Sequence, residues 1–169
     1  MNNSRTTNDV SYIWTRFNLR WLLTGIVAGL GAGLMMMLVA ALLATKAGLP
    51  ATFPIKLVGA AVFGGQAMQV DSFIPGGMAG TVIHFGLAAF FGLVFAQFVA
   101  EWSRKRVLIL MGVLGGMAVW LFWSAMFMPA FNQPMAHLLT KPVSILLHVT
   151  FGLSFGLLMV CLRPVFVRE

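Results

Sequence analysis

Long apolar runs without a charged residue dominate the pattern along the chain. They extend over Trp21–Thr45, Ser72–Ala100, Val107–Thr140 and Pro142–Leu162. Each is long enough for an α-helix to cross a hydrocarbon core of about 30 Å, which takes about 20 residues. The runs are continuously apolar rather than alternating, which favours helices over the strands of a membrane barrel. We therefore expect an all-α membrane protein with four transmembrane helices, near residues 21–43, 80–100, 107–128 and 143–162.

A shorter apolar segment separates the first two expected spans. Its uncharged run, Leu57–Val70, is too short to cross a bilayer, and prolines and glycines interrupt its surroundings. We expect residues 52–68 to form a short interfacial or re-entrant helix in the first outer loop.

The basic residues that flank the spans predict the orientation of the chain. With four spans, eight of the 11 basic residues fall on one side, namely Arg5, Arg16, Arg20, Arg104, Lys105, Arg106, Arg163 and Arg168. The other three, Lys46, Lys56 and Lys141, fall on the opposite side. Because cytoplasmic loops are enriched in Lys and Arg, this distribution predicts a multi-pass protein of the bacterial inner membrane with both termini in the cytoplasm. Residues 1–12 are expected to be a disordered cytoplasmic tail, and residues 13–169 a single transmembrane domain.

The composition agrees with this assignment. Hydrophobic residues make up 60% of the 169 positions, charged residues only 9%, and the mean hydropathy is +0.93. In a soluble domain about a quarter of the residues are charged, so the composition excludes a soluble enzyme and a disordered chain. A disulfide scaffold is excluded because the chain has only one cysteine. The net charge of +7 is explained by orientation signals and anionic lipid contacts, and we expect no nucleic-acid partner.

The second and fourth spans share a sequence pattern that suggests an internal repeat. Each opens with a histidine, His84 or His148, and has a glycine eight residues later. The first and third spans each carry a pair of glycines four residues apart, and the last span has such a pair as well. We expect these small residues to let the helices pack closely. The glycines of these patterns are Gly25 and Gly29, Gly112 and Gly116, and Gly152 and Gly156. Two sequential hairpins in a parallel repeat account for the pattern, and so does chance similarity between apolar helices rich in glycine.

If the repeat is real, His84 and His148 lie at the same depth, near the outer ends of parallel helices. Two such imidazoles are suited to ligate a b-type haem or a metal ion. The alternative is that each imidazole forms a hydrogen bond with a neighbouring backbone carbonyl or water.

The loop before the last span contains a second candidate site. Met126, Met128, Met135 and His137 combine thioethers with an imidazole, a ligand set that suits Cu(I). Methionine also fills irregular gaps in cores, so packing is the competing explanation. The aromatic residues nearby, Trp120 and Trp123 among them, predict an interfacial belt or a groove for a quinone or a lipid tail.

The interiors of the expected spans contain no Asp, Glu, Lys or Arg, and the chain has no recognisable catalytic motif. We therefore expect a non-enzymatic protein, an accessory subunit that packs against itself or against other subunits of a larger membrane complex. One alternative is the haem or metal protein described above. Another is a small oligomeric channel or carrier, with polar candidates Thr24, Thr81, Gln97, Ser124, Thr150 and Ser154.

Three segments together resemble a group of small bacterial inner-membrane proteins of uncharacterised function with four helices. They are the run from Gly29 to Ala61, Ile83-His84-Phe85-Gly86 and His148-Val149-Thr150-Phe151-Gly152. The resemblance implies a four-helix membrane fold. Some members of the group are named as symporters, but four short spans without an interior charge are poorly suited to coupled transport, and no functional residue is carried over.

Overall fold

The computed structural model describes residues 18–69, 75–100 and 103–166. Helices and connecting turns account for these residues, which contain no strand. Four helices are long and apolar enough to cross a membrane, and the chain is a multi-pass integral membrane protein. They are α2 (Leu19–Lys46), α5 (Gly76–Phe98), α6 (Lys105–Phe122) and α9 (Lys141–Phe166). The four expected spans fall on these helices, while the expected tail over 1–12 lies outside the described residues.

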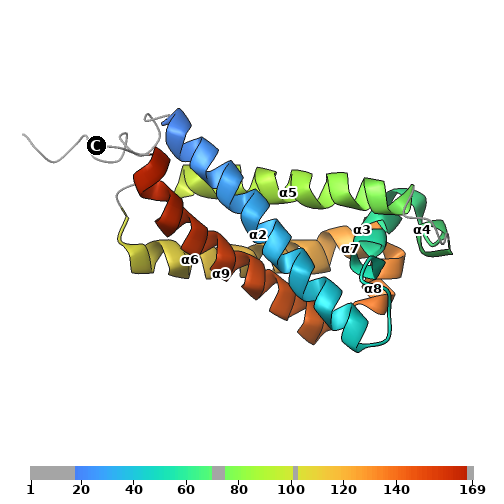
Figure 1. The fold of residues 1–169 in the computed structure, drawn as a ribbon. Coiled ribbons are helices and arrows are strands. Elements are labelled where there is room, and N and C mark those ends of the chain that lie inside the picture. Colours follow the sequence, from blue (N-terminus) through green and yellow to red (C-terminus); the bar gives the residue numbers. More distant parts are fainter. Residues whose placement is uncertain (1–17, 70–74, 101–102, 167–169) are drawn as a thin grey trace, which may run out of the picture.

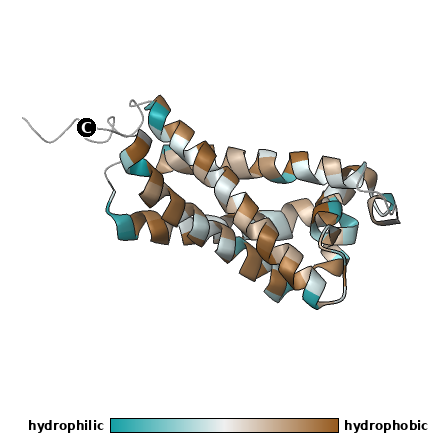
Figure 2. Cartoon of the chain, viewed as in Figure 1, coloured by the Kyte–Doolittle hydropathy of each residue, from teal (hydrophilic) through white to brown (hydrophobic). Residues whose placement is uncertain are grey.

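The long helices pair as two sequential hairpins, which confirms the predicted architecture. Helix α2 packs against α5, and α6 packs against α9. Contacts between α2 and α9 join the two hairpins, and Figure 1 shows these two helices crossing the bundle side by side. Hydrophilic residues gather near the ends of the long helices, whereas hydrophobic residues follow their lengths (Figure 2).

The bundle has two different ends. The start of α2 and the end of α9 lie together at one end, which we call the terminal end (Figure 1). There, the Trp21 indole donates hydrogen bonds to the carbonyls of Ala96 (3.0 Å) and Val99 (2.8 Å), so that the first hairpin is closed. The Arg163 guanidinium donates to the carbonyl of Ser103 at 2.8 Å and closes the second hairpin in the same way.

The opposite end, which we call the loop end, is filled by short helices. Helix α2 diverges from α5 toward this end (Figure 1), and helix α3 (Phe53–Phe63) packs along the start of α5. This apolar helix confirms the short helix expected in the first loop. Glycines allow α3 and α5 to approach closely. A Cβ atom at Gly59 would overlap the carbonyl of Gly76, and one at Gly80 would overlap that of Ile55. Helix α4 (Gln66–Gln69) follows in the same loop.

The third span continues beyond α6 with an altered helical geometry. A π-helical turn η1 (Trp123–Phe127) leads into α7 (Met128–Phe131), and α8 (Gln133–Leu138) completes the second loop. Pro129 has no N–H group to continue the α-helical hydrogen-bond ladder, and its ring conflicts with the carbonyl four residues earlier. A wider turn directly before the proline removes this conflict, and such turns are frequent at functional sites.

Glycines form the contact in both hairpins, where backbones meet without intervening side chains. A Cβ atom at Gly29 would overlap the carbonyl of Ala88 and lie 3.1 Å from Cα of Gly92. A Cβ atom at Gly112 would meet the carbonyl of Gly152 and lie 3.0 Å from Cα of Gly156.

The contacts also correct the register of the repeat. Gly29 and Gly33 are the structural counterparts of Gly112 and Gly116. A Cβ atom at Gly29 or Gly112 would meet the carbonyl of the residue four positions after the histidine, Ala88 or Gly152, and Gly33 and Gly116 follow one turn later. The correspondence expected from sequence, Gly25 and Gly29 with Gly112 and Gly116, is therefore displaced by one turn. Gly25 still lies in the contact, against the carbonyl of Gly92.

Candidate functional site

The two histidines singled out by the sequence line one cavity in the half of the bundle near the loop end. The cavity has a volume of about 90 Å³. All four long helices contribute to its wall, and so do η1 and residues of both loops at the loop end. Representative lining residues are Met36, Val58, His84, Trp123, Met135 and His148.

His84 of α5 binds across its hairpin. Its Nε2 atom lies 2.9 Å from the carbonyl oxygen of Gly33 on α2, and the ring packs edge-on against Phe85 with centroids 5.2 Å apart. A carbonyl only accepts hydrogen bonds, so Nε2 carries the proton and Nδ1 of the neutral ring keeps a lone pair.

His148 of α9 is held differently. It is 7% exposed, and its Nδ1 atom lies 2.8 Å from the carbonyl oxygen of Ser144 in the preceding turn of the same helix. By the same argument Nδ1 carries the proton, and Nε2 keeps the lone pair. Each histidine therefore forms the backbone hydrogen bond that was one of the two sequence interpretations, and each retains one nitrogen that can accept a further hydrogen bond.

The cavity is neutral and largely apolar. The lining residues that the structure describes include no Asp, Glu, Lys or Arg, and their only polar side chains are the two imidazoles and the indole of Trp123. The Trp123 ring is stacked on Phe127, with centroids 4.6 Å apart and an interplanar angle of 16°. Such a lining favours an uncharged ligand, because a buried charge without a partner is strongly disfavoured.

Asn132 connects the two loops at the loop end by hydrogen bonds, next to the cavity. Its side chain is fully buried, and Nδ2 donates to the carbonyl of Leu57 on α3 at 2.9 Å. Its Oδ1 atom accepts from the backbone N–H of Met135 at 3.0 Å, which caps α8. Met135 itself and Val58, which follows Leu57 in the chain, both line the cavity. Sequence analysis did not identify Asn132, although an asparagine shortly before Pro134 is a recognisable helix start.

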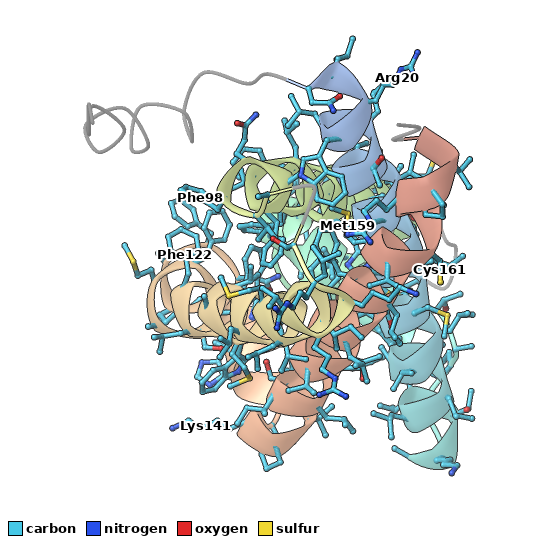
Figure 3. All side chains as sticks on the ribbon, turned by 90° about the vertical axis from the view of Figure 1, so that its left-hand side faces the viewer. Arg20, Phe98, Phe122, Lys141, Met159 and Cys161 are labelled. Carbon is cyan, nitrogen blue, oxygen red and sulfur yellow. The ribbon has the colours of Figure 1, made fainter. Side chains whose placement is uncertain are left out.

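A second hollow of about 260 Å³ lies between α5 and α6. Phenylalanines and α6 glycines dominate its lining, with Phe95 and Phe98 on α5 and Phe122 on α6. Phe98 and Phe122 lie on the same flank of the bundle in Figure 3, and both are largely exposed. Phe91, Val119 and Phe151 line this groove and the histidine cavity alike, so the two hollows adjoin. We call the larger one the α5–α6 groove.

The proposed methionine site is spread over different surroundings. Met126 is 63% exposed and His137 is also exposed, whereas Met128 is buried and Met135 lines the histidine cavity. Among the described residues, no group of three or more His, Cys, Asp or Glu side chains is arranged to hold a metal ion.

Three buried polar atoms near the cavity have no hydrogen-bond partner within the described part of the chain. They are Nε1 of Trp120 and the hydroxyl oxygens of Ser124 and Ser144. Trp120 and Ser124 directly follow the lining residues Val119 and Trp123. Buried polar groups are normally paired, so these three atoms are exceptions within the described residues, and none of their side chains lines the cavity.

The polar residues considered for a pore do not share a lining. The hydroxyl groups of Thr24, Thr81 and Thr150 each donate to a carbonyl of their own helix, at 2.8 Å. None of the six pore candidates lines the histidine cavity or the α5–α6 groove.

Comparison with known protein families, curated proteins and solved structures finds no match to this chain.

Proposed function

We propose that this membrane protein binds an uncharged, lipid-soluble molecule in the histidine cavity. The observation that carries the proposal is that His84 and His148, from different hairpins, line one apolar cavity whose described lining has no charged residue. Small-molecule sites are commonly apolar hollows with a few convergent polar groups. Both hairpins and both outer loops contribute to this wall, so the whole fold serves to enclose the site.

We also propose that the protein acts by binding rather than by catalysis, as an accessory subunit of a larger complex in the bacterial inner membrane. Among the described residues no carboxylate lines the cavity to orient an imidazole as a general base, and each imidazole proton is directed to a backbone carbonyl. The long helices expose many large apolar side chains that suit contact with lipid or with other subunits.

The test is the ligand content of the purified protein. Full-length protein is extracted in mild detergent, and its bound small molecules are identified by mass spectrometry of an organic extract. We compare the natural protein with His148→Ala and with His137→Ala, a matched control whose histidine is exposed and outside the cavity. We expect a stoichiometric lipid-soluble compound in the natural protein and the control, and its loss from His148→Ala. Equal content in all three, or none in the natural protein, would overturn the proposal.

Haem binding is the second candidate, and one observation favours it. The Nδ1–H of His148 is bonded to a backbone carbonyl and leaves Nε2 for a metal, which is the usual arrangement of ligating histidines. On His84, however, Nε2 is directed to Gly33, and a cavity of about 90 Å³ is smaller than the macrocycle. An absorption spectrum separates the two proposals. We expect no Soret band, and a band that disappears in His148→Ala would establish haem instead.

A further inference from the structure

We propose that the ligand is an isoprenoid quinol, with its hydroxylated ring in the histidine cavity and its chain in the α5–α6 groove. This inference rests on the proposed function, because it names the chemical class that the same cavity takes. It is carried by the hydrogen-bonding polarity of the two imidazoles and by the wall of Phe91, Val119 and Phe151 that the two hollows share.

The free nitrogens of the histidines determine which headgroup fits. Both ring protons are directed to backbone carbonyls, so His84 Nδ1 and His148 Nε2 are left as acceptors. A nitrogen that accepts hydrogen bonds can bind a hydroxyl group of a ligand, but it forms no hydrogen bond with a ligand group that is itself only an acceptor. A reduced quinone ring carries two hydroxyl groups, one for each imidazole, whereas the oxidised ring presents two carbonyl acceptors.

The absence of charge in the lining excludes other common membrane molecules. Phospholipids and ionised fatty acids carry an anionic group, and the described cavity wall offers no Lys or Arg to pair with it. An aromatic ring has suitable neighbours there, because Phe91, Trp123 and Phe151 all line the cavity.

The cavity is small for an aromatic ring, so its walls must move to admit one. At about 90 Å³ it is smaller than the cavity of about 150 Å³ that is known to accept benzene. Two of the lining side chains, Met36 and Met135, are unbranched and adapt readily to a guest. The adjoining groove shares the wall of Phe91, Val119 and Phe151, and the proposal requires these side chains to move apart so that the two hollows join.

The α5–α6 groove is suited to an apolar chain. Its lining, as far as the described residues show it, has no charged side chain and consists of apolar side chains and the α6 glycines at 112, 115 and 116. Gly115 in particular makes room for the Phe95 ring, which a Cβ atom would overlap. Phe98 and Phe122 are 68% and 46% exposed, so the groove opens on the side that faces lipid. A chain that starts at the shared wall can therefore leave the protein directly into the bilayer.

The experiment measures the binding of defined probes to the full-length protein in detergent, by native mass spectrometry under anaerobic conditions. The probes are decylubiquinol, decylubiquinone and 1-decanol, which share a ten-carbon chain and differ in the headgroup. We expect decylubiquinol to bind at least about tenfold more tightly than decylubiquinone, since one hydrogen bond of about 1.4 kcal/mol corresponds to that ratio. The preference is expected to be smaller in His148→Ala, which removes one of the two acceptors.

A second pair of variants tests the chain. Ala118 lies at the exposed edge of the groove, so Ala118→Trp fills the groove without entering the core. Leu110→Trp is the matched control, since Leu110 is exposed on the same helix but lines neither hollow. We expect Ala118→Trp to weaken decylubiquinol binding about tenfold or more, and Leu110→Trp to leave it unchanged.

The outcomes separate this inference from the proposed function. Binding of decylubiquinone or 1-decanol as tight as that of decylubiquinol would overturn the quinol assignment, while a lipid-soluble ligand that depends on His148 would still stand. An unchanged affinity in Ala118→Trp would overturn the path of the chain. If none of the probes binds and nothing co-purifies, both the inference and the proposed function fail.

Discussion

At the residue scale, the histidines show how much a sequence pattern can establish. Two histidines, each followed by a glycine eight residues later, predicted a shared depth, and His84 and His148 do line one cavity. Their hydrogen bonds differ, however, because one bonds to the opposite helix of its hairpin and the other to its own helix. The choice of ring nitrogen depends on which carbonyl lies within reach, and that is settled by helix packing rather than by the local sequence.

The glycine contacts give a prediction at this scale. Gly29→Leu places a side chain where the backbone of α5 already lies, against Ala88 and Gly92. Gly86→Leu is the matched control, because no atom lies within 4 Å of the position where its Cβ would be. We expect Gly29→Leu to destabilise the fold by about 1–3 kcal/mol or more. Gly86→Leu is expected to be neutral or slightly stabilising, since leucine is the better helix former. Thermal unfolding of the two variants in detergent, followed by circular dichroism, measures the difference, and equal midpoints would contradict the assigned contact.

At the element scale, the short helices of the outer loops are as important as the spans. Helix α3 was expected from its apolar run, and it is present over Phe53–Phe63. Its connection to the second loop could not be expected, because Asn132 and its partner Leu57 are 75 residues apart in the chain. The π-helical turn was not expected either, although Pro129 provides the local reason for it.

The contact between the loops gives the second prediction. Asn132→Leu removes the cap of α8 and the hydrogen bond to α3, and leaves the carbonyl of Leu57 without this donor. We expect a loss of about 1–3 kcal/mol of stability and faster hydrogen exchange in α3 and α8. Gln133→Ala is the control, since Gln133 is exposed and its amide bonds only within its own loop. Exchange that is equally slow in both variants would show that Asn132 does not hold the loops together.

At the scale of the whole molecule, the hydropathy pattern predicted the number and place of the spans. Lipid requires long apolar helices whatever their neighbours are, so this information is local in the sequence. The two hollows could not be predicted in this way. They depend on how far α2 diverges from α5 and on the angle at which the second hairpin packs, and both follow from contacts between distant glycines.

The orientation in the membrane gives the third prediction. The start of α2 and the end of α9 lie at the same end of the bundle (Figure 1). Arg20 is at the start of α2, Lys105 at the start of α6 and Arg163 near the end of α9. We expect reporter domains fused to either terminus to be cytoplasmic, because basic residues are retained on that side. A reporter inserted next to Gly48, in the turn after α2, is expected on the opposite side. Termini found in different compartments would refute the arrangement of four spans.

The backbone contacts at the glycines have a mechanical consequence. Where Gly29 meets Ala88 and Gly112 meets Gly152, there is no side chain that could change rotamer to absorb a shift. Each glycine contact is therefore a rigid point, and the long helices can move only by pivoting about it. The hydrogen bonds of Trp21 and Arg163 hold each hairpin closed at the terminal end. A guest that enters toward the loop end is thus accommodated by tilting whole helices apart, and that tilt passes from one hairpin to the other along the seam between α2 and α9.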